Sequence, residues 1–245
     1  MKNTKFYLQA AMLLLPAFLS AQNVIPEPTQ YRPAKGQFVL TAAETKAFEA
    51  QDVLPGRVVQ YVISGSTPMD ADEAYHLKIT PDSVFIQSAT ATGAFRGKET
   101  LKQLLRSGKG TAKACVINDA PRYAWRGFML DESRHFFGKK KVKQLLDIMA
   151  SLRLNVFHWH LTDEPGWRIE IKKYPLLTQI GAKGNWHDPD APATFYTQDD
   201  IKEIVAYAAA RHIMVVPEFD MPGHATAACR AYPELSGGEI GRAHV

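Results

Sequence analysis

Acidic, histidine and arginine residues gather at three places in this chain of 245 residues, each directly after a short apolar run. The three groups are Asp131, Glu132, Arg134 and His135; His158, His160, Asp163 and Glu164; and Glu218, Asp220 and His224. Side chains of these types hydrogen-bond hydroxyl groups and transfer protons. Trp159 and Trp167 stand among them, and their rings could cover the C–H face of a hydroxyl-rich ligand such as a sugar.

The apolar runs before these groups have the length and composition of strands. They cover residues 128–130, 156–161 and 213–219, and apolar residues at helical spacing lie between them, at 142–152 and 201–208. The order strand, helix, strand, helix, strand predicts parallel strands with right-handed crossovers. Because polar groups at the carboxyl ends of parallel strands share one rim, the sequence predicts the first three βα units of a (β/α)8 barrel, which needs eight.

The first half of the chain predicts a different, smaller unit. Thr41 with Glu44 begins a short helix, residues 75–86 alternate as a β-hairpin, and a helix with a leucine stripe ends at Gly108. Prolines before residue 37 predict an extended lead-in. We therefore expect a small α+β support domain over residues 22–120, without a catalytic group of its own, and the partial barrel over residues 121–238.

The first residues of the chain and its composition indicate where the protein is located and which partners it lacks. Residues 1–21 have the charged start, apolar run and small residues of a signal peptide, so we expect a periplasmic or secreted protein with no membrane segment in its mature form. The net charge of +4 is small, and the sequence has no stripe of basic residues. Both observations argue against a nucleic-acid partner. Cys115 and Cys229 form no ligand cluster, and we expect two ordinary thiols, although pairing cannot be read from sequence.

Three other interpretations remain open for residues of these groups. Arg134 could form a purely structural ion pair with Asp131 or Glu132. His158 and His160 share one face of a strand, so with Asp220 and His224 they could bind zinc in a metal-dependent hydrolase, or they could be hydrogen-bonded core residues.

Three long motifs carry a family resemblance: R-G-x-x-L-D-x-x-R-H-F from Arg126, H-W-H-L-T-D-E-P-G-W-R-I-E-I-K-K-Y-P from His158, and P-E-F-D-M-P-G-H from Pro217. They resemble the family-20 glycoside hydrolases, the β-N-acetylhexosaminidases, and the likeness runs from about residue 24 to Leu235, including Gly93 to Gly97 in the first domain. The resemblance implies a cofactor-free retaining mechanism, in which the 2-acetamido carbonyl of the substrate is the nucleophile. Its substrate would be an oligosaccharide or glycan that ends in N-acetylhexosamine.

The resemblance also implies roles for single residues. Arg134 would hydrogen-bond hydroxyls of the terminal sugar, Asp163 and His224 would support the catalytic acid, and Asp220 would help to hold the rim. Glu164-Pro165 stands where Asp-Gln is commoner in the family, which leaves the role of Asp163 intact.

The principal Asp-Glu pair of the family, which orients the acetamide and protonates the leaving oxygen, is absent from this chain. Gly237-Gly238-Glu239 lies too soon after His224 to be that pair, and residues 239–245 resemble the translation of a sequencing adapter. We therefore expect an N-terminal fragment that is inactive alone. The alternatives are the metal-dependent hydrolase and a non-catalytic sugar-binding protein.

Overall fold

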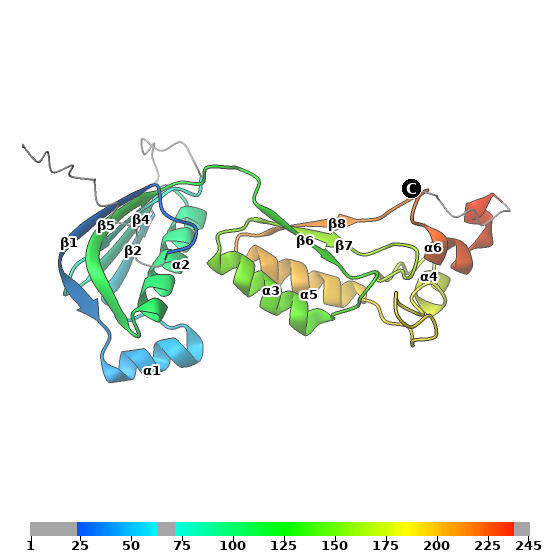
Figure 1. The fold of residues 1–245 in the computed structure, drawn as a ribbon, viewed down its shortest axis with the longest axis horizontal. Helices are drawn as coiled ribbons and strands as arrows, with labels where there is room; N and C mark the ends of the chain where they lie inside the picture. The colour runs from blue at the N-terminus through cyan, green and yellow to red at the C-terminus, as the bar shows by residue number, and fades with distance from the viewer. Residues whose placement is uncertain (1–23, 63–71, 238–245) are drawn as a thin grey trace, which may run out of the picture.

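The computed structural model describes residues 24–62 and 72–237, which form two domains joined end to end (Figure 1). The predicted signal segment 1–21 and the tail 239–245 lie outside the described residues. Among the described residues, no helix is long and apolar enough to cross a bilayer. Both cysteines are free thiols, with Cys115 buried in the first domain and Cys229 half-buried in the second.

The first domain is a five-stranded sheet with order β1-β5-β3-β4-β2. Its elements are β1 (Gln30–Val39), α1 (Ala42–Gln51), β2 (Val58–Val62), β3 (Tyr75–Ile79), β4 (Val84–Ser88), α2 (Ala91–Ser107) and β5 (Thr111–Asp119). Helix α2 covers the face of the sheet that is turned toward the second domain (Figure 1). It lies very close to its neighbours, because a Cβ on Gly93 would come 2.2 Å from the carbonyl oxygen of Ala74.

Local signals placed most of this domain correctly. Thr41 and Glu44 form the predicted reciprocal capping box at the start of α1, and β3 pairs with β4 as the predicted antiparallel hairpin. The lead-in and the segment after α2, however, are strands that sequence reasoning did not identify. They are β1 and β5, which pair with each other across about eighty residues of sequence. Pro33 argued against a strand at this position, but proline is tolerated in an edge strand such as β1.

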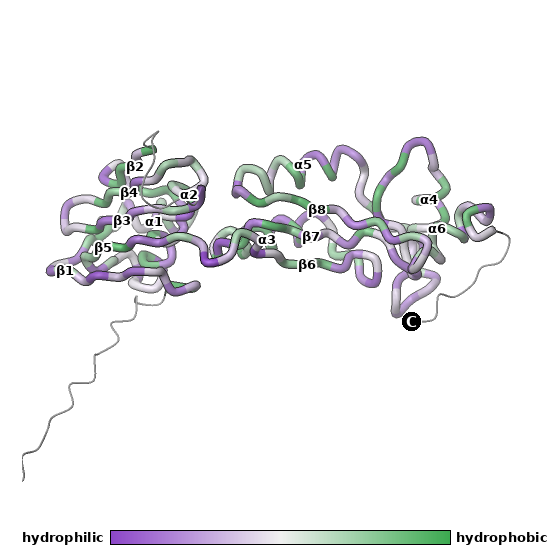
Figure 2. The backbone as a smooth tube through the Cα atoms, turned by 90° about the horizontal axis from the view of Figure 1, so that it is seen from above, coloured by the Kyte–Doolittle hydropathy of each residue, from purple (hydrophilic) through white to green (hydrophobic). Residues whose placement is uncertain are grey.

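The second domain contains the predicted alternation of strand and helix, and the predicted fold class is confirmed. Strands β6 (Gly127–Asp131), β7 (Val156–His160) and β8 (Met214–Glu218) run parallel and side by side, as Figure 2 shows from above. Helices α3 (Lys139–Ser151) and α5 (Gln198–Ala209) lie together on one face of this sheet. The rest consists of α4 (Leu176–Gln179), α6 (Thr226–Ala231) and a 3-10 turn at Pro233–Ser236.

Strand alternation decides which side chains enter the core. Phe157 and Trp159 point toward α3 and α5 and are fully buried there with Leu146, Ile204 and Tyr196. The intervening strand residues point to the opposite face, because successive side chains of a strand alternate. Thr197 caps α5 through a capping box with Asp200, as its sequence predicted.

Arginines connect the two domains at the amino end of the parallel strands. Arg96 on α2 donates to Glu73 at 2.7 Å and to the carbonyl of His212, directly before β8, at 2.9 Å. Arg153, directly before β7, reaches into the first domain and donates to the Thr100 hydroxyl at 2.6 Å. Figure 1 shows that the opposite, carboxyl end of the strands lies far from the first domain.

Candidate active site

One cross-strand row at the carboxyl end of the sheet brings three polar side chains together. The register pairs Asp131 with His160 and His160 with Glu218. All three therefore lie on the sheet face that α3 and α5 do not cover. The imidazole of His160 is buried, and its Nδ1 atom lies 2.8 Å from a carboxylate oxygen of Glu218.

Asp163 is the centre of the hydrogen-bond network that extends from this row. Its side chain is only 2% exposed, and its Oδ2 atom lies 2.7 Å from Nη2 of Arg134 and 2.9 Å from Nε2 of His160. Its Oδ1 atom lies 3.2 Å from Nδ1 of His224. A single carboxylate thus joins residues that follow all three strands.

Arg134 is held in place by two carboxylates. Its guanidinium pairs with Asp131 at 2.7 Å as well as with Asp163, and one-third of its side chain is exposed. The structural ion pair considered from sequence is therefore present with Asp131. Glu132 takes no part in it, because it points into the core and accepts from Tyr196. An anchored guanidinium with an open side can still donate to an incoming hydroxyl group.

A turn with unusual backbone geometry supplies His224. The residue has φ of 54°, in the left-handed region that is costly for a residue with a side chain. The chain turns at Pro222-Gly223, after β8 has ended at Glu218. His224 thereby reaches Asp163 from the third strand, and part of its ring stays exposed.

Burial and neighbouring charges shift the pKa values of His160, Glu218 and Asp220. Burial opposes charge on His160, but its hydrogen bonds to Glu218 and Asp163 prevail and raise its pKa. For Glu218, burial is likewise outweighed by the hydrogen bond and charge of His160, which lower its pKa. Burial and the nearby Glu218 carboxylate raise the pKa of Asp220. The pair of His160 and Glu218 therefore favours the charged form of each partner.

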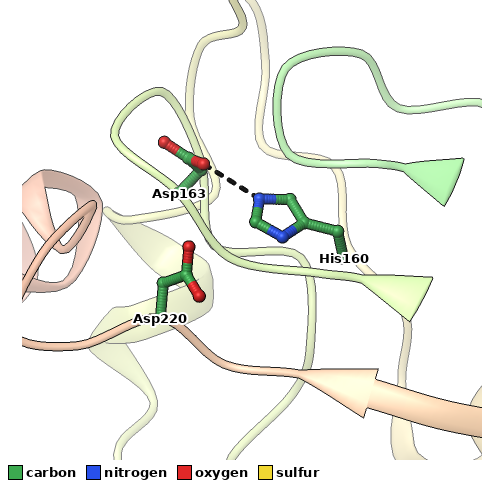
Figure 3. Close-up of side chains that lie close together, drawn as sticks. All are labelled: His160, Asp163 and Asp220. Atoms are coloured by element: carbon green, nitrogen blue, oxygen red, sulfur yellow. Dashed lines mark hydrogen bonds and ion pairs between the residues drawn. The ribbon is translucent and has the colours of Figure 1, made fainter. Parts of the chain in front are cut away.

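Asp220 lies beside the His160–Asp163 pair, as Figure 3 shows. One ligand-type atom from each of His160, Asp163 and Asp220 lies within 4.8 Å of the others, which is the donor set of a small cation site. The guanidinium of Arg134 already contacts Asp163 at 2.7 Å and His160 Nε2 at 3.1 Å. Since a cation there would face a fixed positive charge, this donor set fits a metal ion poorly. His158 faces Glu218, outside the set.

Several rim expectations were wrong. Trp159 and Trp167 are buried in two separate cores, at 0% and 4% exposure, so neither ring is available to cover a sugar. Strand alternation explains Trp159, since it shares the helix-covered face with Phe157. Glu132 is fully buried for the same reason, one position after Asp131. His135 is exposed and contacts the ring of His187, away from Asp163.

Sequence reasoning placed Glu218 at a strand end but gave it no role. The structure puts its carboxylate between His158 and His160, at 2.5 Å and 2.8 Å. The signal was available, because two histidines separated by one residue on a central strand face the same residue of the next strand. What sequence could not supply was the register that aligns them.

Comparisons with known proteins place this geometry in a family. Residues 123–244 match the sequence model described as glycosyl hydrolase family 20, catalytic domain, and residues 43–120 match domain 2 of that family. Among relatives, the chain is 34% identical to a beta-hexosaminidase of Porphyromonas gingivalis, over 93% of this chain and 34% of that protein. A beta-hexosaminidase of Vibrio furnissii is 36% identical, over 86% of this chain and 39% of that protein.

Solved structures agree with the sequence matches. An N-acetyl-beta-hexosaminidase of Streptomyces plicatus, in complex with Thio-NAglucal, superposes with a TM-score of 0.79 at 34% identity, covering 91% of this chain and 51% of that one. An exo beta-N-acetylglucosaminidase of Vibrio harveyi, in complex with N-acetylglucosamine, superposes with a TM-score of 0.75 at 32% identity. This match covers 90% of this chain and 39% of that one. The chain spans 34% and 39% of the length of the two bacterial relatives named first. Its two domains, their order and their motifs show that this chain belongs to glycosyl hydrolase family 20, the β-hexosaminidase family.

Proposed function

We propose that this chain is the N-terminal part of a secreted exo-β-N-acetylhexosaminidase. The whole protein would remove terminal N-acetylglucosamine or N-acetylgalactosamine from oligosaccharides or glycans. The observation that carries the proposal is the position of Asp163, which joins Arg134, His160 and His224 at the ends of three parallel strands. Polar groups that converge at the carboxyl end of barrel strands are typical of the active sites of such enzymes.

Arg134 would bind the substrate. Its guanidinium is fixed by Asp131 and Asp163, and its exposed side could donate to two hydroxyls of the terminal sugar. Because both carboxylates hold the guanidinium in place before a sugar binds, the Arg134 side chain loses little conformational entropy on binding. A fixed donor beside these hydroxyls also favours a single orientation of the sugar ring.

Asp163 and His224 would act through the acid that completes the site. The family mechanism lets the 2-acetamido carbonyl oxygen attack the anomeric carbon while a carboxylic acid protonates the departing oxygen, and water later opens the cyclic intermediate. The imidazole of His224, bound to Asp163 by one nitrogen, keeps its other nitrogen for that carboxyl group. Asp163 would hold the imidazole in one tautomer, as an acid support requires. Asp220 would hold the rim beside them.

The acid and its neighbouring aspartate have no counterpart in this chain, so we propose that it is inactive alone. The signal-like segment 1–21 supports a periplasmic or extracellular location, where glycans with terminal hexosamines are accessible. No cofactor enters this mechanism.

The test compares two purified proteins, this chain and a longer product of the same gene that includes all eight barrel strands. Chromogenic N-acetylglucosaminide and N-acetylgalactosaminide are the substrates. We expect hydrolysis by the longer protein only. In the longer protein, Arg134→Ala should lower kcat/KM about 10- to 100-fold, the range for losing a charged hydrogen-bond donor.

Lys172→Ala is the matched control, since Lys172 is an exposed cation away from the network. It should leave kcat/KM unchanged. Hydrolysis by the 245-residue chain would contradict its proposed inactivity. A longer protein without activity on either substrate would contradict the proposed enzyme, and stoichiometric zinc in it would favour a metal-dependent hydrolase.

A further inference from the structure

Arg168 is a fully buried arginine that belongs to neither the substrate-binding nor the acid-supporting group. It lies on the connection between β7 and α5, and its exposure is 0%. No carboxylate lies within ion-pair distance of it among the described residues. Its guanidinium instead donates to four backbone carbonyl oxygens: those of Ser133, Ala182, Gly184 and Thr194, at 2.6 to 3.2 Å.

The bond to Ser133 fixes the peptide that leads into Arg134. The Ser133 carbonyl accepts from Nη2 of Arg168 at 2.8 Å, and the amide of Arg134, on the other side of the same peptide, donates to Asp131 at 3.0 Å. A planar peptide held on both sides cannot rotate. The start of the Arg134 side chain is therefore set by Arg168 and Asp131 together.

The same guanidinium also supports the turn that carries Asp163. A Cβ on Gly166 would come 2.3 Å from Cζ and Nη2 of Arg168, so the guanidinium packs directly on this glycine. The Gly166 carbonyl accepts from the amide of Asp163 at 3.2 Å and from the hydroxyl of Ser133 at 2.6 Å. Arg168 thus contacts both turns whose side chains meet in the Arg134–Asp163 ion pair.

We propose that Arg168 is a positioning residue that fixes the distance between the Arg134 turn and the Asp163 turn. This inference rests on the proposed function for its catalytic consequence, but not for its structural one. Only arginine has the shape for the task, because its planar fork can bind carbonyls in several directions at once. Lysine would place a point charge with three donors at one site. The buried charge is stabilised by the carbonyl dipoles that it contacts, and at longer range by the charge of the buried Glu132 carboxylate.

The structural test is hydrogen–deuterium exchange on the 245-residue chain. Arg168→Met should raise exchange about tenfold in peptides over residues 131–137 and 182–196, because these segments lose their hydrogen bonds to the guanidinium and open locally more often. Peptides from β3, β4 and α2 should not change. Gly166→Ala, which keeps Arg168 but displaces its guanidinium, should give the same local pattern.

Arg153→Met is the matched control, because Arg153 is another buried arginine that donates to a backbone carbonyl, that of Pro26. It should raise exchange at the domain interface and leave residues 131–137 unchanged. Equal loss of protection throughout the chain in Arg168→Met and Gly166→Ala would overturn the proposal, as would unchanged exchange at residues 131–137.

The catalytic test is a double-mutant cycle in the longer, active protein. Arg168→Lys should lower kcat/KM about 10- to 100-fold by displacing Arg134, as a shift near 1 Å can cost that much. In an Arg134→Ala background the same change should cost much less, since the part of its effect that acts through Arg134 is already lost. Additive losses would refute positioning and leave only general destabilisation. If no variant shows activity, the proposed function fails, while the exchange experiment still decides the role of Arg168.

Discussion

Replacing Asp163 with asparagine tests whether one carboxylate holds the three strand ends together. The amide keeps the shape but removes the charge, and it turns one acceptor oxygen into a donor. That donor would face Arg134 Nη2, His160 Nε2 or His224 Nδ1, which all lie within 3.2 Å of the carboxylate. The substitution therefore removes one of the two carboxylates that neutralise the Arg134 guanidinium and leaves only Asp131 paired with it, rather than only removing one hydrogen bond.

The expected magnitude follows from burial. Removing one partner of a buried pair costs about 3–5 kcal/mol, and we expect about 3 kcal/mol because Arg134 is partly solvated. Its side chain is 33% exposed, against 2% for Asp163. The free energy of unfolding of the second domain should fall by that amount.

Tryptophan fluorescence during urea unfolding is the assay. All four tryptophans, at positions 125, 159, 167 and 186, belong to the second domain, so the signal reports on that domain alone. Asp147→Asn is the control, since Asp147 forms an exposed pair with Arg211, and such pairs contribute less than about 1 kcal/mol.

A second substitution separates charge from packing. In Asp163→Asn with Arg134→Met, part of the lost stability should return, because the new amide no longer faces the guanidinium that Asp163 had neutralised. A loss below about 1 kcal/mol for Asp163→Asn alone would refute the reasoning, since it would mean that the network is solvated and weak.

Three further predictions use the same fluorescence signal. Hydrogen bonds that outweigh burial raise the pKa of His160 in the folded protein. Its contribution to the free energy of unfolding is therefore complete below about pH 6.5 and is lost as pH rises through the raised pKa. His160→Gln should flatten this decline, and an unchanged pH profile would argue against a charged His160. Trp159→Ala should cost about 3–5 kcal/mol as a core deletion, whereas a stable variant would argue against its burial. Thr197→Ala should cost about 1 kcal/mol by removing the α5 cap, while Thr41→Ala, in the tryptophan-free first domain, should leave the transition unchanged.

Local sequence patterns were sufficient wherever the determining contacts are near in sequence. The caps at Thr41 and Thr197, the hairpin over residues 75–86 and the strand–helix alternation after residue 127 all depend on neighbours within a few positions. The family motifs likewise consist of consecutive residues, so they indicated the fold class and family directly. Strands β1 and β5 were missed because their pairing joins distant segments and their own patterns are weak.

The site shows the same division. Sequence alone determined which residue types follow each parallel strand, and parallel strands must end at one edge, so Arg134, Asp163, Asp220 and His224 had to lie near one another. Only the tertiary structure decided that Trp159 and Glu132 face the core, that Glu218 lies between two histidines, and that a buried Arg168 supports both turns. Register and the facing of each strand position arise from packing against the helices. Those contacts span tens of residues, and no local pattern encodes them.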